Sequence, residues 1–143
     1  MISGFSDIRI PAEPENLARL TAFLGACADA SGCDASLKNN VLLSAEEAFI
    51  NICSYAYSAE RGDVSVSCGL RDGQLVVEMT DEGVPFDPLS APVPDISPGL
   101  DERTPGGLGI HFIKKLTEGC ISYRRENRRN ILRFCFRCGS GEN

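Results

Sequence analysis

The stretch "MTDEGVPFDP", residues 79–88, ends an apolar run with two acidic residues, a glycine and two prolines. Proline lacks the N–H that would continue a β-ladder, so a strand entering this stretch must end within it. Gly83 allows another group to approach the backbone closely, and Asp81 places a carboxylate beside it. Such a corner is either a simple turn or the floor of a binding pocket, and the flanking sequence has to decide between them.

Length and composition favour a single globular domain. The chain has 143 residues, of which 43% are hydrophobic, enough for one core. Its formal net charge of -6 argues against direct nucleic-acid binding, which favours a basic excess. Arginines do gather at Arg124, Arg125, Arg128 and Arg129, and we interpret them as a solvated hairpin tip.

The N-terminal sequence "MISGFSDIRI" lacks a basic segment followed by an apolar one, so no signal peptide is expected. No apolar run approaches the roughly 18 residues of a membrane span. The predicted location is therefore the cytoplasm, without a membrane partner.

Seven cysteines form no regular framework. Cys135 and Cys138 match a Cys-x-x-Cys spacing, but positions i and i+3 of a strand point to opposite faces. A zinc site is therefore not expected, and we interpret the cysteines as reduced, small apolar side chains.

The hydrophobic pattern predicts strands and helices in the order β-α-α-β-β-loop-α-β-β. This order predicts an α+β fold, a two-layer sandwich whose mostly antiparallel sheet carries its helices on one face. The expected elements are a strand over 5–11, a helix over 14–30 stopped by Gly32, a helix capped by Asp34 and ending near Tyr57, strands over 63–70 and 74–80 joined by an Asp-Gly turn, a proline-rich loop over 81–107, a helix over 106–119, and strands over 120–126 and 130–138.

Two further segments carry chemistry. Glu47 and Asn51 are four residues apart on the second predicted helix and hence neighbours on one face, where they could be a general base beside a metal ligand or simply part of a polar face.

Gly106, Gly107 and Gly109 open the third predicted helix. Glycines there let the free N–H groups of a helix start meet a phosphate, although a flexible loop would look the same.

The segments "EAFIN" (47–51), "DEGVPFDP" (81–88) and "GGLGIHFIKKL" (106–116), in this order, resemble the successive motifs of the GHKL ATPase superfamily. Within that superfamily the chain is similar to the small anti-sigma factor serine/threonine kinases of bacteria. The resemblance covers about Ser44 to Lys115 and implies a Bergerat, or histidine-kinase-like, ATPase fold spanning residues 1–143, with a nucleotide lid at about 84–105.

The resemblance also implies ATP and Mg²⁺ as cofactors and a role for each matching residue. Glu47 would accept the proton of an attacking serine, Asn51 would give Mg²⁺ an oxygen ligand, Asp81 would accept a hydrogen bond from the adenine amine, and Gly83 would let the base lie close. The remaining cofactor-binding positions surround the start of the third predicted helix: Arg103, Gly106, Gly107, Leu108 and Gly109.

Three positions depart from the pattern or stay open. Tyr55 stands where this family often has histidine, so no role is assigned to it. Arg103 precedes the glycine pair by three residues, and its contact with phosphate is left open. His111 lies within the phosphate-binding helix, and we interpret it as a packing or surface residue.

The function implied is an ATP-dependent serine protein kinase that phosphorylates a STAS-domain anti-sigma antagonist and sequesters a sigma factor. A homodimer is also implied, and the short first strand has an edge on which a second copy could pair. Two alternatives remain: a nucleotide-controlled binding module without kinase turnover, and a switch kinase that activates a partner phosphatase.

Overall fold

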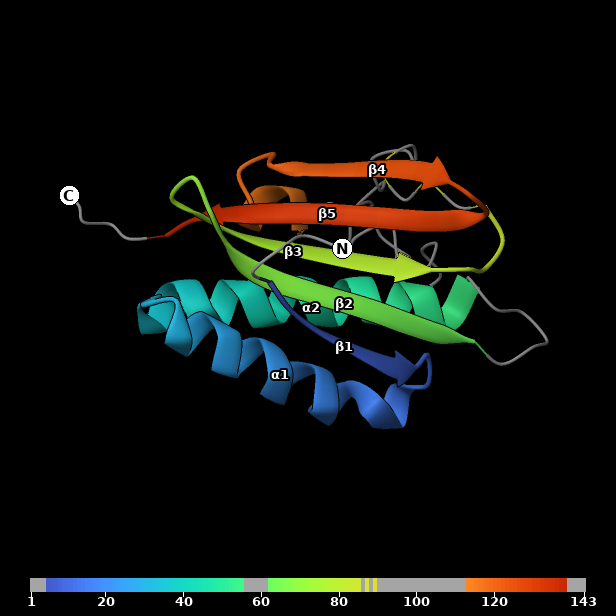
Figure 1. The fold of residues 1–143 in the computed structure, drawn as a ribbon, viewed down its shortest axis with the longest axis horizontal. Coiled ribbons are helices and arrows are strands. Elements are labelled where there is room, and N and C mark those ends of the chain that lie inside the picture. The colour runs from blue at the N-terminus through green and yellow to red at the C-terminus, as the bar shows by residue number, and fades with distance from the viewer. Residues whose placement is uncertain (1–4, 56–61, 86, 88, 90–112, 139–143) are drawn as a thin grey trace, which may run out of the picture.

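The computed structural model describes residues 5–55, 62–85, 87, 89 and 113–138. In this part of the chain no helix has both the length and the apolar character needed to cross a membrane. The elements in chain order are β1 (Ser6–Pro11), the 3-10 helix η1 (Pro14–Asn16), α1 (Leu17–Ala30), α2 (Ala35–Tyr55), β2 (Asp63–Arg71), β3 (Gln74–Asp81), β4 (Ile121–Glu126) and β5 (Arg129–Arg137) (Figure 1).

The described strands form one five-stranded sheet in the order β1-β2-β3-β5-β4, and all neighbouring pairs are antiparallel. β5 lies between β3 and β4, so it pairs with β3, a strand about fifty residues earlier in the sequence (Figure 1). This register places Asn130, at the start of β5, opposite Asp81, at the end of β3.

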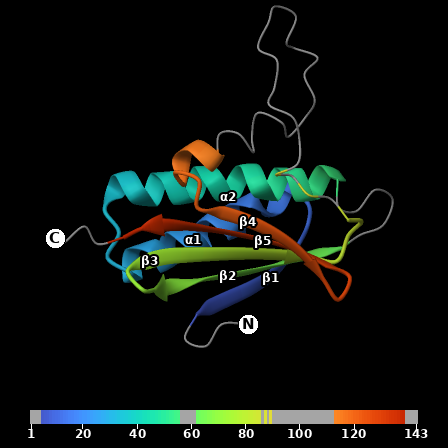
Figure 2. The ribbon, with the colours of Figure 1, turned by 90° about the horizontal axis from the view of Figure 1, so that it is seen from above.

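Both long helices pack on the same face of the sheet (Figure 2). Alternate residues of each strand point to that face, as the period of two requires. The helices supply apolar stripes at helical spacing, among them Leu20 and Leu24 of α1 and Val41 and Phe49 of α2, all fully buried. The strands contribute Val64, Val66, Val77, Met79, Leu132 and Phe134 to the same core.

Local signals end the elements where the sequence predicts. The Asp34 Oδ1 atom accepts a hydrogen bond from the Leu37 N–H at 2.8 Å, which caps the start of α2. Gly32 has a φ of 81°, a left-handed conformation that stops α1. Asp72 and Gly73 both have positive φ, 53° and 80°, as the tight turn between β2 and β3 needs.

The predicted α+β sandwich with helices on one face is confirmed, with small differences at element ends. The first predicted helix starts as a 3-10 turn at Pro14–Asn16 before α1 begins at Leu17. α2 is described to Tyr55, and its predicted extension to Tyr57 lies outside the described residues. Of the third predicted helix only 113–116 is described as helical, followed by a turn over 117–119.

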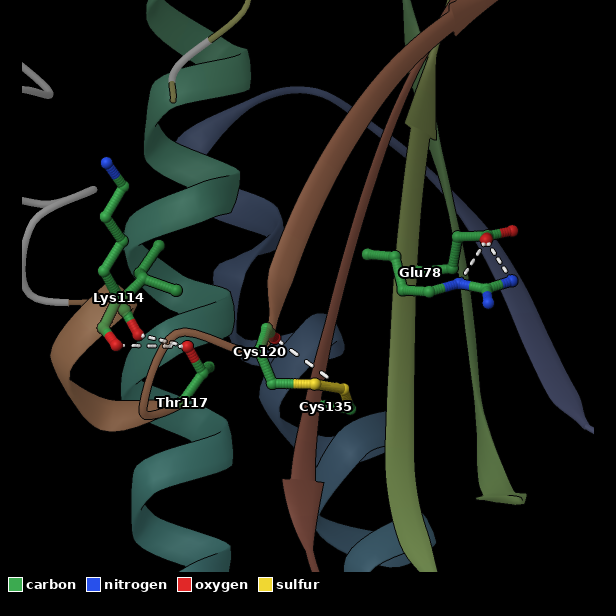
Figure 3. Close-up of a disulfide and its surroundings, with 7 residues drawn as sticks. Glu78, Lys114, Thr117, Cys120 and Cys135 are labelled. Atoms are coloured by element: carbon green, nitrogen blue, oxygen red, sulfur yellow. Dashed lines mark hydrogen bonds and ion pairs between the residues drawn. A yellow bond between two sulfur atoms is a disulfide. The ribbon is translucent and has the colours of Figure 1, made fainter. Parts of the chain in front are cut away.

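The expectation of reduced thiols is wrong for one pair of cysteines. Cys120, just before β4, is joined by a disulfide to Cys135 of β5 (Figure 3). Their Cα atoms lie 5.5 Å apart because Cys120 continues the antiparallel register of β4 with β5, and the Cys135 N–H donates to the Cys120 carbonyl oxygen at 3.0 Å. Cys138 contacts Cys33, with 3.2 Å between the sulfur atoms, so the two cysteines of the Cys-x-x-Cys spacing have different partners, in agreement with opposite faces.

Candidate nucleotide site

The described candidate residues lie on two elements that end at the same side of the molecule. The C-terminal end of α2 and the C-terminal end of β3 point the same way in both ribbon views (Figures 1 and 2). Asn51 lies in the last two turns of α2, and Asp81 is the last residue of β3. The antiparallel sheet and the helix packed on it therefore place the ends of two elements, whose motif residues are 30 positions apart in sequence, at the same side of the molecule.

Asp81 is a buried acid, with 5% of its surface exposed. Its Oδ1 atom accepts hydrogen bonds from the Gly83 N–H and from the Asn130 side-chain amide, both at 2.9 Å. Within the described part of the chain no further hydrogen bond reaches this carboxylate, which leaves Oδ2 as the oxygen that can accept a bond from a ligand. The bond to Gly83 also explains the corner in the sequence, because the side chain closes the turn that β3 enters.

Burial raises the pKa of Asp81 above its ordinary value, because the charged form loses hydration. The hydrogen bonds from Asn130 and Gly83 and the positive charge of Arg125 act in the opposite direction and lower the pKa. The site therefore contains a desolvated acid whose pKa is raised even though Asn130, Gly83 and Arg125 favour its charged form. Such groups are concentrated at functional sites.

Asn130 is a functional candidate that the sequence patterns did not reveal. It is 5% exposed, and its amide donates to the Val84 carbonyl oxygen at 2.8 Å as well as to Asp81. Its Oδ1 atom accepts bonds from the Tyr123 hydroxyl at 2.5 Å and from Arg125 at 3.1 Å. The available signal was the Asn at the start of a strand next to charged residues, but only the pairing of β5 with β3 puts it against Asp81.

Glu47 and Asn51 differ sharply in burial, although they are neighbours on α2. Glu47 is exposed, whereas Asn51 is only 7% exposed. Among the residues that the structure describes, neither the buried Nδ2 atom of Asn51 nor the buried Oγ atom of Ser44 has a hydrogen-bond partner. Because a buried donor without a partner is costly, the Nδ2 atom of Asn51 is a group that an acceptor on a bound ligand, such as a phosphate oxygen, would satisfy.

These residues fit the ATP and Mg²⁺ that the motifs imply. Mg²⁺ bound with substrate phosphates needs only one or two protein oxygens and keeps several waters, and the amide of Asn51 can supply one such oxygen. In the described ranges no three His, Cys, Asp or Glu side chains gather as a metal site. Asp81 and Gly83, which is also buried, can hold the base at the other end of the ligand.

Several predicted positions lie outside the described residues. They are Arg103, Gly106, Gly107, Leu108 and Gly109, together with His111 and most of the predicted lid at 84–105. Tyr55 is the last described residue of α2, and its side chain lies outside the description. The described part of the site therefore comprises its α2 and β3 sides, and the phosphate-binding side stays a prediction.

A separate groove of about 850 Å³ opens on the other face of the sheet. Its lining includes Ser65, Ser67, Glu78 and Thr80, which alternate along their strands with the residues that face the helices. Asp81 and Glu82 border its end. The groove lies away from α2, so it does not coincide with the pocket that the motifs predict.

Comparisons with known proteins identify the family and the fold of the chain. The family model described as "Histidine kinase-like ATPase domain" matches residues 10–136. The chain is 28% identical over 120 residues to Serine-protein kinase RsbW of Bacillus velezensis, covering 80% of this chain and 74% of the relative. Against Serine-protein kinase RsbW of Bacillus subtilis (strain 168) it is 26% identical over 122 residues, covering 81% and 76%.

Solved structures share the fold at low sequence identity. The blue-light activated histidine kinase of Erythrobacter litoralis EL346 superposes with a TM-score of 0.57 at 18% identity, over 87% of this chain and 42% of that one. The histidine kinase AdeS of Acinetobacter baumannii gives a TM-score of 0.50 at 12% identity, over 94% of this chain and 68% of that one. The chain thus spans less than half of the first of these structures.

Proposed function

Because the chain belongs to the family of histidine kinase-like ATPase domains, we propose that it is an ATP-dependent serine protein kinase. Its relatives named Serine-protein kinase RsbW support a protein serine as the acceptor. We further propose that the acceptor is a STAS-domain anti-sigma antagonist and that the kinase also holds a sigma factor. The observation that carries nucleotide binding is the buried Asp81 carboxylate, whose Oδ1 is occupied by donors while Oδ2 can accept.

Adenine recognition would follow from the hydrogen-bonding pattern at Asp81. The exocyclic amine of adenine is a donor, and Oδ2 is an acceptor held in fixed orientation by the two bonds to Oδ1. A base that presents a carbonyl oxygen at this place would set two acceptors against each other. A site built on a buried acceptor rejects such a base strongly, because its own polar atom stays unpaired.

Phosphoryl transfer would divide between the two polar residues of α2. When bound, Mg²⁺ supplies charge that neutralises the phosphates, and Asn51 would hold it through an amide oxygen. Glu47 is exposed one turn earlier, where the hydroxyl of a protein substrate can reach it from solvent. It would accept the serine proton as general base, a role that requires hydrogen-bond reach and therefore an open position.

The two alternatives differ from this proposal in the step after nucleotide binding. A nucleotide-controlled binding module would use the Asp81 pocket without turnover, and a switch kinase would act on a phosphatase partner. The exposed Glu47 favours a kinase over a module, since a buried carboxylate could not meet a macromolecular acceptor. The choice between a sigma factor and a phosphatase is made by identifying the partner.

We expect calorimetric titration with Mg²⁺ present to show ATP binding at least about tenfold tighter than GTP binding, since guanine presents a carbonyl oxygen to Asp81. The same titration in EDTA should weaken ATP binding, because Asn51 then lacks the ion that links it to the phosphates. Circular dichroism under the assay conditions serves as the control that the chain is folded. Equal affinity for the two nucleotides would contradict the adenine pocket.

We also propose a homodimer, as the family resemblance implies. β1 is an edge strand of the sheet, and its outer backbone groups can pair with a second copy. Multi-angle light scattering over a hundredfold concentration range should give twice the mass of the 143-residue chain at the upper end. A constant monomer mass across this range would contradict the dimer and favour the switch-kinase alternative.

A further inference from the structure

We propose that Asn130 is the positioning residue for adenine selectivity, with Tyr123 and Arg125 fixing its side-chain amide against Asp81. The inference rests on the proposed nucleotide site and adds residues from the last hairpin to it. None of the three lies in the motifs that carry the resemblance, which end at about Lys115.

The hydrogen bonds define which end of the Asn130 amide faces Asp81. Its Nδ2 atom lies 2.9 Å from Asp81 Oδ1 and 2.8 Å from the Val84 carbonyl oxygen, and both of these atoms are acceptors. Its Oδ1 atom lies 2.5 Å from the Tyr123 hydroxyl and 3.1 Å from Arg125 Nη1, which can only donate. A flipped amide would set acceptor against acceptor at Asp81 and donor against donor at Arg125, so a single orientation satisfies the network.

This orientation has a direct consequence for the carboxylate. With Oδ1 held by Asn130 and by the Gly83 N–H, rotation of the Asp81 carboxyl group would break two bonds inside a buried site. Oδ2 is therefore held in one position. A fixed acceptor discriminates between donor and acceptor ligands better than a rotating one, because it cannot move away from a mismatch.

The same hairpin also holds the backbone of the corner that follows Asp81. Arg125 Nη1 donates to the Gly83 carbonyl oxygen at 2.9 Å, and Asn130 donates to that of Val84. Residues 81–84 are thus bonded to β4 and β5, which come about forty residues or more later in the sequence. Both the carboxylate and the backbone beside the proposed base would lose their position if this network were broken.

The test compares Asn130→Asp with a matched control, Asn127→Asp, by titrating ATP and ITP into each folded protein. The change at 130 replaces the donor facing Asp81 by an acceptor of the same shape, whereas Asn127 is exposed at the tip of the same hairpin. Hypoxanthine in ITP lacks the amine. We expect Asn130→Asp to weaken ATP binding by about tenfold or more and to bring the ATP-to-ITP affinity ratio close to one. Asn127→Asp should keep the ratio of the unaltered chain.

A second pair of variants serves if Asn130→Asp does not fold. Arg125 is exposed, so Arg125→Gln should fold and lower the ATP-to-ITP ratio by about two- to fivefold, with partial rescue in Arg125→Lys. Arg128→Gln, at the exposed hairpin tip, should leave the ratio unchanged. An unchanged ratio in Asn130→Asp or Arg125→Gln, with only a loss of stability, would overturn the positioning role. Failure of the unaltered chain to bind ATP would instead refute the proposed function.

Discussion

Replacing Glu47 by alanine is expected to lower phosphoryl transfer to the protein substrate by about 10²- to 10⁴-fold, the usual contribution of a general base. ATP affinity should stay within about twofold, because Glu47 is exposed and Asn51 and Asp81 remain in place. Stability should also be kept, since alanine is the best helix former and the side chain buries little surface. The measurement is transfer of labelled phosphate from ATP to the proposed STAS-domain antagonist, beside calorimetry with ATP.

Glu46→Ala is the matched control for this experiment. Glu46 is the neighbouring acid on α2 and differs from Glu47 in pointing about 100° around the helix. It should transfer phosphate at close to the unaltered rate. If Glu47→Ala transfers phosphate as fast as Glu46→Ala, Glu47 is not the base. If the unaltered chain binds ATP but never phosphorylates its antagonist, the binding-module alternative gains support.

Most of the fold was predictable because its signals are local. The alternation of Val64, Val66 and Cys68 with serines shows one buried face of β2 without reference to any other strand. The Asp34 cap and the Asp72–Gly73 turn are likewise set by residues within four positions of each other. The exact ends of the elements follow less directly from local signals. For example, Pro14 starts the 3-10 helix η1, and α1 begins only at Leu17, where the apolar stripe starts.

The strand order and its consequences were not predictable in the same way. β5 pairs with β3 and β4, and its pairing with β3 is non-local in sequence. The residues around Asn130 therefore do not indicate that Asp81 lies opposite it. A solvated hairpin tip describes the exposed Arg128 of the arginine cluster, but Arg125 also donates to the Gly83 carbonyl oxygen and to Asn130. The Cys120–Cys135 disulfide depends on register for the same reason.

Burial separated the members of the candidate site in a way that spacing could not. Glu47 and Asn51 are neighbours by the four-residue rule, but α2 turns only Asn51 toward the interior. An exposed acid one turn from a buried amide suits a reaction in which a protein substrate arrives from solvent while the ion is held inside. The sequence supplies both residue types, and the packing of α2 on the sheet assigns them different surroundings.

The change Asp81→Asn should weaken ATP binding by about five- to 150-fold, the expected effect of losing one buried hydrogen bond and leaving the amine of adenine unpaired. The structure makes this substitution specific. The Oδ1 atom of asparagine can keep both bonds, from Gly83 and from Asn130, while its NH₂ group replaces Oδ2 and meets the adenine amine as donor against donor. Calorimetry with ATP measures the loss, and Asp87→Asn, on an exposed side chain, provides the matched control.

The stability of Asp81→Asn relative to the unaltered chain should depend on pH, because the variant lacks the titrating carboxyl group. Burial raises the pKa of Asp81 in the folded state, so folding favours the protonated acid. Its contribution to stability is fully present below the pKa of the unfolded chain and is lost as the pH rises through the raised folded value. Asparagine is neutral at every pH and does not undergo this loss. The melting temperature of Asp81→Asn relative to the unaltered chain should therefore be higher at pH 7 than at pH 4. The contrary result is a loss of ATP affinity together with a loss of stability that is the same at pH 4 and pH 7. It would show that the Asp81 carboxylate supports the corner itself and that its burial is structural and not an adaptation to a ligand.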